Sequence, residues 1–287
     1  MSLRLRLSLC LTVFFGLVTA MPLQAQFSIQ EMFVPAAITN HMNETMPVRV
    51  WRNYQKRDLP VPVVVMLHGS GECGQENAKQ LPPFAPIHRQ ALIDEDIPPA
   101  LYLVPQCTQR NAWVRTIAFK EDYRAPRYPA PALRTVKEYL DQLVAEGIAD
   151  PDRLYIVGLS LGGFGAWDAI QRWPNYFAAA VPICSGGSLQ EEQIKNALTT
   201  SVWVFHGEKD VNVPVACSRR MVAAMTKAGG SPKYTEYPNA GHNVWTRALQ
   251  DRAVVKWLFR QKRGKAASEP SESTGVWGRI KAYVTPQ

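Results

Sequence analysis

The chain has 287 residues, of which 46% are hydrophobic and 20% are charged, as in an ordinary globular protein that can bury a sizeable core. Its formal net charge is +8, but Arg4 and Arg6 carry two of these charges and the segment from Arg260 onward carries a net four, which leaves two for the body. A body this close to neutral excludes a nucleic-acid-binding domain, and no nucleic-acid partner is expected.

The first 25 residues form a separate unit. Arg4 and Arg6 precede an apolar run from Leu7 to Ala20, and "MPLQAQ" follows it. This pattern is typical of a secretory signal, so we expect residues 1–25 to be a signal peptide cleaved after Ala25, with Ala20 as the alternative. The apolar run is shorter than the ~20 residues of a spanning helix. The sequence therefore predicts an exported protein, periplasmic or secreted, with no stable membrane insertion after the signal is removed.

The body, residues 26–262, alternates strand and helix patterns. Residues 28–52 predict antiparallel lead-in strands, and 72–99 is polar and proline-rich, typical of a loop with a short helix. Five apolar runs lack period-two alternation, as parallel strands buried on both faces do. These runs are 61–69, 100–106, 153–160, 177–185 and 201–207. A short strand, "KYTEYP", comes later at 233–238.

Helical spacing fills the intervals between these strands. The apolar residues from Leu133 to Val144 predict a helix that ends at Gly147, and 213–230 and 244–261 each predict one more. Strand and helix in repetition indicate an α/β domain, with a doubly wound, mostly parallel sheet flanked by helices. About 15 residues separate Ser185 from the strand at Ser201, which leaves no room for a large lid. Residues 263–287 read as a low-complexity basic tail.

A possible nucleophile lies in "GLSLGGFGAW", at a step from strand to helix. Gly158 and Gly162 flank Ser160 in the pattern GxSxG, which forms a sharp turn that lifts the serine hydroxyl above the sheet. A serine hydroxyl needs a base, and the base needs an acid that fixes its tautomer. Asp210 and His242 follow Ser160 in the order expected on such a sheet. We therefore predict a catalytic triad of Ser160, Asp210 and His242.

Alternatives to these assignments exist in the sequence. Glu208 is a second candidate for the acid, and Asp210 is also placed to cap the helix that begins near Pro214. His68 and His206 end strands, and we expect them to brace loops. An oxyanion hole needs two amides aimed at the developing negative charge. Leu161 is expected to supply one amide, and Ser70 the other, with Gly71 as its alternative.

Five blocks in order carry a resemblance to a known family: "LHGSGECGQEN", "VPQCTQRNAW", "GLSLGGFGAW", "FHGEKDVNVP" and "NAGHNVW". Together they resemble the α/β-hydrolase superfamily, specifically its exported carboxylesterases related to feruloyl and acetylxylan esterases and polyhydroxybutyrate depolymerases. The resemblance implies the same triad. It also implies that the block around Trp113 lines the substrate cleft, and Phe164 and Trp245 are further candidates for apolar walls, with ordinary core packing as the alternative for Phe164.

Four cysteines remain after the signal is removed, and an exported chain permits disulfides. Cys73 and Cys107 each follow a strand at the same end of the sheet, so they are candidates for a disulfide at the rim of the site. Cys184 and Cys217 are a second candidate pair, or Cys184 is a buried free thiol. CxxC and HExxH patterns are absent from the sequence, so no metal or other cofactor is expected.

The predicted function is serine-dependent hydrolysis of carboxylic esters through an acyl-enzyme. We expect short-chain or aromatic esters, small or attached to a polymer such as a carbohydrate, because a cleft without a lid is open. A serine peptidase of the same fold and a non-catalytic exported binding protein are the alternatives.

Overall fold

The computed structural model describes residues 28–114 and 123–264. The predicted signal peptide and the predicted tail beyond residue 264 lie outside this part of the chain. One sheet of eight strands runs through it, in the order β1-β2-β4-β3-β5-β6-β7-β8. The strands are β1 (Val34–Thr39), β2 (Thr45–Asn53), β3 (Val61–Leu67), β4 (Ala100–Pro105), β5 (Ala149–Leu159), β6 (Ala179–Ile183), β7 (Ser201–Gly207) and β8 (Lys233–Tyr237).

The sheet is mostly parallel, as predicted. β1 pairs with β2, and β2 with β4, in antiparallel fashion, while β4, β3, β5, β6, β7 and β8 pair in parallel. The predicted lead-in strands are therefore β1 and β2. Because the carboxyl ends of the parallel strands meet at one edge, the segments that follow β3, β5, β7 and β8 are gathered there.

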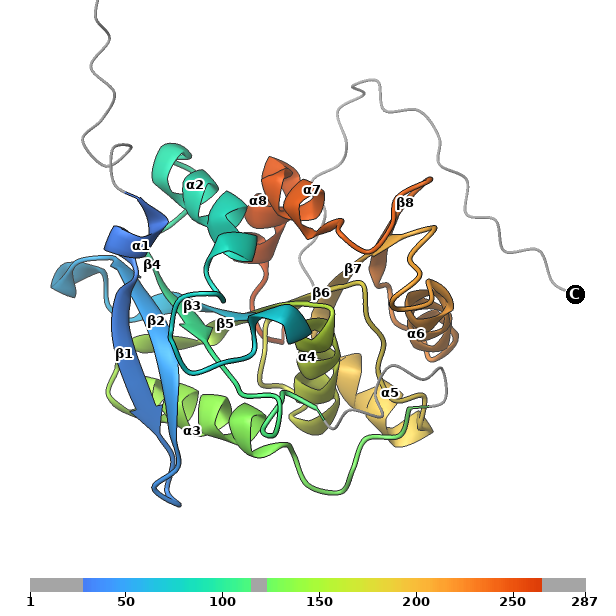
Figure 1. Cartoon of the computed structure of the whole chain (residues 1–287), viewed down its shortest axis with the longest axis horizontal. Helices are drawn as coiled ribbons and strands as arrows, with labels where there is room; N and C mark the ends of the chain where they lie inside the picture. Colours follow the sequence, from blue (N-terminus) through green and yellow to red (C-terminus); the bar gives the residue numbers. More distant parts are fainter. Residues whose placement is uncertain (1–27, 115–122, 265–287) are drawn as a thin grey trace, which may run out of the picture.

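Helices cover both faces of the sheet (Figure 1). α2 (Ala85–Ile93), α7 (Trp245–Gln250) and α8 (Arg252–Arg260) contribute to one core, and α3 (Pro131–Ala145), α4 (Leu161–Arg172), α5 (Glu191–Ala197) and α6 (Ala216–Lys227) contribute to the other. The short elements are α1 (Ile29–Met32) and the 3₁₀ helices η2 (Lys56–Asp58), η3 (Ser70–Glu72) and η4 (Pro82–Phe84).

Strand β3 shows why its sequence does not alternate between apolar and polar residues. Val63, Val65 and Leu67 lie in the core beneath α3 and α4, whereas Val64 and Met66 lie in the core beneath α2 and α8. All seven residues of the strand are buried. A strand buried on both faces has no polar side, which confirms the prediction of a doubly wound sheet.

Two details of the fold concern predictions made for single segments. The stretch predicted as one helix over 244–261 is two helices, and that prediction is wrong. The helical conformation is interrupted at Asp251. Its carboxylate accepts a hydrogen bond of 2.9 Å from the Ala253 amide and so caps α8. Between β6 and β7 the only helix is α5, in agreement with the expected lack of a large lid. Within the two described ranges, no helix is long and apolar enough to span a bilayer.

Candidate active site

Ser160 lies at the turn between β5 and α4, with backbone angles of φ 51° and ψ −119°. This left-handed conformation is uncommon for a residue with a side chain. The neighbouring glycines make the turn possible. A Cβ on Gly158 would lie 2.1 Å from the Gly162 carbonyl oxygen, and a Cβ on Gly162 would lie 1.9 Å from the Leu67 carbonyl oxygen. Both glycines are thus required by close backbone contacts, as GxSxG predicts.

A chain of hydrogen bonds joins three of the predicted residues. The Ser160 hydroxyl oxygen lies 2.9 Å from His242 Nε2, and His242 Nδ1 lies 2.6 Å from Asp210 Oδ2. Ser160 follows β5, Asp210 follows β7, and His242 follows β8, so the parallel sheet brings together side chains that are 82 and 32 positions apart. The carboxylate fixes the proton of His242 on Nδ1, which leaves Nε2 free to accept the serine proton.

Asp210, rather than Glu208, contacts His242. The Glu208 carboxylate accepts the Asn239 amide proton instead, at 2.8 Å. Asp210 Oδ1 accepts the amide protons of Asn212 and Val213 at 2.9 Å. Burial on its own raises the pKa of Asp210, but hydrogen bonds from His206, His242 and the Val213 amide outweigh it and hold the pKa below its ordinary range. Asp210 is therefore a carboxylate at neutral pH.

The loop after β3 lies against Ser160. A Cβ on Gly69 would be 3.5 Å from Ser160 Cβ, and Ser70 is the first residue of η3. Leu161 is the first residue of α4. Amides in the first turn of a helix have no acceptor within that helix, so the Ser70 and Leu161 amides are both available to a ligand. Gly71 is exposed and a Cβ on it would meet nothing within 4 Å, so it is not a point of close approach.

His68 braces the same loop through two hydrogen bonds, as expected for this residue. His68 Nδ1 donates to the Gly69 carbonyl at 2.7 Å, and Nε2 accepts the Cys107 amide proton at 3.1 Å. Burial lowers the pKa of His68 to about 4, against a smaller opposing effect of the Gly69 hydrogen bond. The neutral ring has one donor and one acceptor, and the loop uses both.

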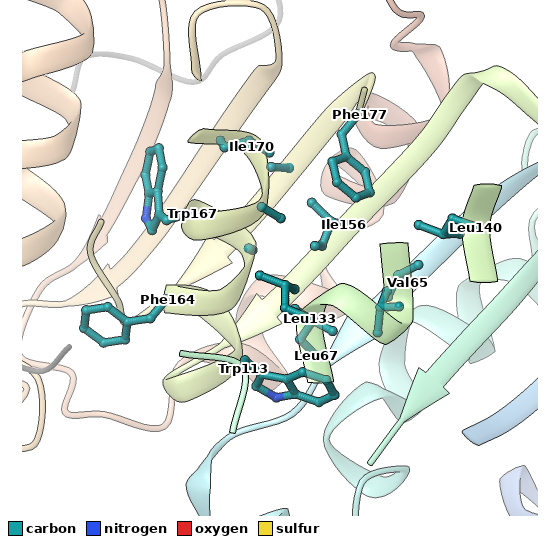
Figure 2. Close-up of a cluster of buried hydrophobic side chains, with 14 of the residues drawn as sticks. Val65, Leu67, Trp113, Leu133, Leu140, Ile156, Phe164, Trp167, Ile170 and Phe177 are labelled. Carbon is teal, nitrogen blue, oxygen red and sulfur yellow. The ribbon is translucent and has the colours of Figure 1, made fainter. Parts of the chain in front are cut away.

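Two of the three aromatic residues predicted to line the cleft do not do so. Trp113 and Phe164 are both 0% exposed, and Figure 2 shows their side chains in a buried cluster with Leu67 and Trp167. The Trp113 indole donates to the His68 carbonyl at 3.0 Å, so it supports the loop rather than facing a substrate. The prediction for these two residues is wrong because their rings are turned into the core.

Trp245 has a different position. It is half-buried, begins α7, and its ring lies edge-on to His242 with the ring centroids 5.5 Å apart. An aromatic side chain beside the histidine that contacts Ser160 provides an apolar surface at this site.

Comparison with known proteins identifies the family to which the chain belongs. The sequence matches the phospholipase/carboxylesterase family over residues 53–255, which contain Ser160, Asp210 and His242. The chain belongs to this family. It is 26% identical over 223 residues to a probable carboxylesterase of Oryza sativa subsp. japonica, covering 73% of this chain and 93% of the rice protein.

Solved structures agree with this assignment. A thermostable esterase superposes with a TM-score of 0.71 at 31% identity, covering 82% of this hydrolase and 64% of the esterase. A ferulic acid esterase superposes with a TM-score of 0.59 at 16% identity, covering 79% and 97% of the two chains. An acylaminoacyl peptidase of Pyrococcus horikoshii has a TM-score of 0.57 at 13% identity, covering 82% and 43%. The last two share the α/β-hydrolase fold and carry no further argument.

In the part of this hydrolase that the structure describes, Cys73, Cys107 and Cys184 form no disulfide. Cys73 Sγ and Cys107 Sγ lie 3.9 Å apart at the ends of η3 and β4, so the predicted pair is brought together but not bonded. The Cys184 thiol donates to the His242 carbonyl at 3.1 Å and is buried, in line with the alternative of a free thiol and not with a bond to Cys217.

Two groups in the described part of the hydrolase hold three potential metal ligands each: His68, Cys73 and Cys107, and Cys184, His206 and Asp210. In both groups the histidine nitrogens already form hydrogen bonds. His206 Nε2 lies 3.0 Å from the Val213 carbonyl and 3.2 Å from Asp210 Oδ2. The sequence predicts His206 only as a residue that braces a loop, and this contact with Asp210 is not predicted. The only signal was its position four residues before Asp210 in "FHGEKD".

Proposed function

We propose that this protein is a serine-dependent carboxylic ester hydrolase that acts through an acyl-enzyme. The observation that carries the proposal is the continuous hydrogen-bonded chain from Ser160 Oγ through His242 to Asp210, with distances of 2.9 and 2.6 Å. Each of these distances lies within the reach of a proton transfer in the resting protein.

In the proposed mechanism Ser160 Oγ attacks the ester carbonyl carbon while His242 Nε2 takes the serine proton. His242 then returns this proton to the departing alcohol, which leaves an acyl group on Ser160. Water then attacks the acyl carbonyl carbon while His242 takes one of its protons. The bond between this carbon and Ser160 Oγ breaks, His242 returns the proton to Oγ, and the acid is released. Asp210 keeps His242 oriented and stabilises its charged form.

The negative charge on the tetrahedral intermediate needs donors. We assign the Leu161 amide and the Ser70 amide, because α4 begins directly after Ser160 and η3 begins directly after Gly69, which approaches Ser160 Cβ. Ser70 is preferred to Gly71 because it directly follows Gly69, the residue of the loop that approaches Ser160 Cβ. Each such donor contributes a few kcal/mol, about 3, to stabilisation of the transition state.

For the substrate we propose short-chain or aromatic esters, including esters attached to carbohydrate. Trp245 supports an aryl or small acyl group beside His242. The small α5 is the only helix between β6 and β7, which suits a bulky alcohol portion outside the site. The fold shared with a ferulic acid esterase is compatible with this class. We further propose that the protein is exported, because residues 1–25 have the pattern of a signal peptide. The mass of the N-terminal peptide of the mature protein tests this proposal.

The experiment compares wild type with Ser160→Ala on p-nitrophenyl acetate, a feruloyl ester and a matched p-nitroanilide, with labelling by a fluorophosphonate. We expect ester turnover and labelling by wild type only. Turnover of the anilide above the ester would indicate the peptidase instead. A folded wild type with neither turnover nor labelling would indicate the non-catalytic binding protein.

A further inference from the structure

His206 is a fully buried histidine that the proposed mechanism does not use. It is the sixth residue of β7, is 0% exposed, and lies four residues before Asp210. Its Nε2 atom contacts the Val213 carbonyl at 3.0 Å and Asp210 Oδ2 at 3.2 Å. Asp210 Oδ2 thus has two histidine neighbours, His206 on one side and His242 on the other.

The hydrogen bonds around His206 favour two protons on its ring. Nε2 contacts only a carbonyl and a carboxylate, which are both acceptors, so it carries a proton. Nδ1 lies 2.7 Å from the Ser218 hydroxyl, and this hydroxyl donates its single proton to the Ser185 carbonyl at 2.8 Å. With its proton on the Ser185 carbonyl, Ser218 has only lone pairs left for His206, and this arrangement requires a proton on Nδ1 as well.

A neutral His206 would require a different arrangement. The Ser218 proton would turn to Nδ1, and the buried Ser185 carbonyl would lose the hydrogen bond it accepts. A buried carbonyl that loses its donor destabilises the fold, because no hydrogen bond then compensates for its removal from water. The contrast with His68 is direct, because His68 has one nitrogen against a carbonyl and the other against an amide N–H, which a neutral ring satisfies.

The charges around His206 agree with a cation there. The Asp210 carboxylate is the nearest, and the Cys184 thiol lies at the same cluster with its pKa raised by burial to about 12, so it is neutral. Glu236 is the register partner of His206 on β8, and its carboxylate binds Arg219 and the Tyr234 hydroxyl. The neutral hydroxyl of Ser218 comes from α6.

We propose that His206 is a positioning residue for Asp210, and that it is held as an imidazolium that donates to Asp210 Oδ2 opposite His242. The proposal rests on the proposed function, since it assigns a role within the same triad. Two donors on one carboxylate oxygen fix the orientation of the carboxylate. The positive charge of His206 also partly neutralises the negative charge of Asp210. Asp210 therefore stabilises the protonated form of His242 less strongly than it would without His206.

The first test reads protonation without activity. In ¹⁵N-labelled Ser160→Ala protein, two-dimensional NMR of the histidine rings should show His206 with both nitrogens protonated at neutral pH. His68 should show one protonated and one bare nitrogen in the same spectrum. The His206 signals are identified by their loss in His206→Gln. A bare nitrogen on His206 would overturn the proposal, whether or not the wild type hydrolyses esters.

The second test reads the pH profile of kcat/KM for p-nitrophenyl acetate, with active sites counted by fluorophosphonate titration. His206→Gln keeps a donor toward Asp210 but removes the charge. Because His242 then holds its proton more tightly, the acid limb should move to higher pH by about one unit. Ser218→Ala, which removes the acceptor of the second proton, should move it in the same direction.

The control is His41→Gln, an exposed histidine whose ring contacts Glu138, and its profile should match that of wild type. A purely structural His206 would lower the titrated fraction of active sites and the melting temperature in His206→Gln but leave the limb in place. That outcome contradicts the proposal. An inactive wild type would overturn the proposed function alone, since the NMR test still decides the state of His206.

Discussion

Gly162, in the first turn of α4, and Leu67, the last residue of β3, touch through their backbones, and a Cβ on Gly162 would fall 1.9 Å from the Leu67 carbonyl oxygen. The same Cβ would lie 2.7 Å from the His68 carbonyl oxygen. This contact sets the distance between the turn that presents Ser160 and the loop that precedes Ser70. The two segments that carry the proposed oxyanion-hole amides are therefore held together by backbone contact alone.

Gly162→Ala should disrupt this contact. Backbone carbonyls cannot move aside like a flexible side chain, so we expect a loss of more than about 3 kcal/mol in the free energy of unfolding, or no folded protein. Urea denaturation measures this. Gly71→Ala is the matched control for stability, because a Cβ there meets nothing within 4 Å. Equal stability of the two variants would show that the α4 turn is not held against β3.

Asp210→Asn should lower kcat/KM for esters by a factor on the order of 10³ to 10⁴, because an amide no longer fixes the tautomer of His242. Glu208→Gln is the control, since Glu208 accepts a bond from the Asn239 amide instead. We expect it to stay within about threefold of wild type, as for a change at an exposed site. A larger loss in Glu208→Gln than in Asp210→Asn would reverse the assignment of the acid.

His68 should make the protein less stable in mild acid. Its pKa falls from an ordinary value near 6.5 in the unfolded chain to about 4 in the fold. The unfolded chain therefore binds more protons between these values, and stability is complete above pH 6.5 and is lost as the pH falls toward 4. The shift corresponds to about 3 kcal/mol.

The measurement is the free energy of unfolding of wild type and His68→Asn at pH 7 and at pH 4. Asparagine keeps a donor near the position of Nδ1 without a titrating group. The variant should lose less stability than wild type over this interval. His88, whose pKa burial also lowers to about 4, retains part of the effect in both proteins. Equal losses in the two proteins would contradict the prediction.

Cys73 and Cys107 should form a disulfide when the protein is exposed to an oxidant such as oxidised glutathione. The sulfurs are 3.9 Å apart, and the hydrogen bond from Cys107 lowers the pKa of the Cys73 thiol, which favours attack by its thiolate. The bond would close a loop of 34 positions and add about 4 kcal/mol to stability.

Peptide mapping without reduction detects this bond. The same treatment should leave Cys184 free, because it is buried and its thiol donates to the His242 carbonyl. Cys73→Ser should abolish the gain in melting temperature. Free thiols at both Cys73 and Cys107 after oxidation would mean that the pair cannot reach bonding geometry.

Trp245→Ala should raise KM for a feruloyl ester about fivefold, since one aromatic contact contributes on the order of 1 kcal/mol. KM for p-nitrophenyl acetate, measured in parallel, should change less, because its acetyl group covers less of the indole than a feruloyl group does. Equal changes in KM would indicate that Trp245 supports the loop of His242 and does not contact the acyl group.

Much of the fold follows from local sequence. Strands such as β3 are recognisable because every residue is apolar, and only a strand covered on both faces tolerates that. The grouping of Ser160, Asp210 and His242 follows from the same sheet, since parallel strands deliver their following residues to one edge. The order of the three residues along the chain then matches the order of their strands.

Other features depend on contacts that a sequence does not display. The segment "RNAW" does not indicate whether Trp113 points into the cleft or packs under the loop after β3. Its orientation depends on the hydrogen bond from its indole to the His68 carbonyl. The break at Asp251 interrupts an otherwise helical pattern with a single capping bond. The state of His206 depends on Ser218 from α6, which the fold brings to Nδ1.

The backbone of Ser160 has a consequence for how this protein can change. A side chain at φ 51° and ψ −119° costs about 1–3 kcal/mol, which glycine would largely avoid. Ser160→Gly, which removes the proposed nucleophile, is thus a change that folding itself favours. If the proposed function is right, selection on thermal tolerance alone would drive this chain toward an inactive protein, and only the demand for catalysis keeps the serine in place.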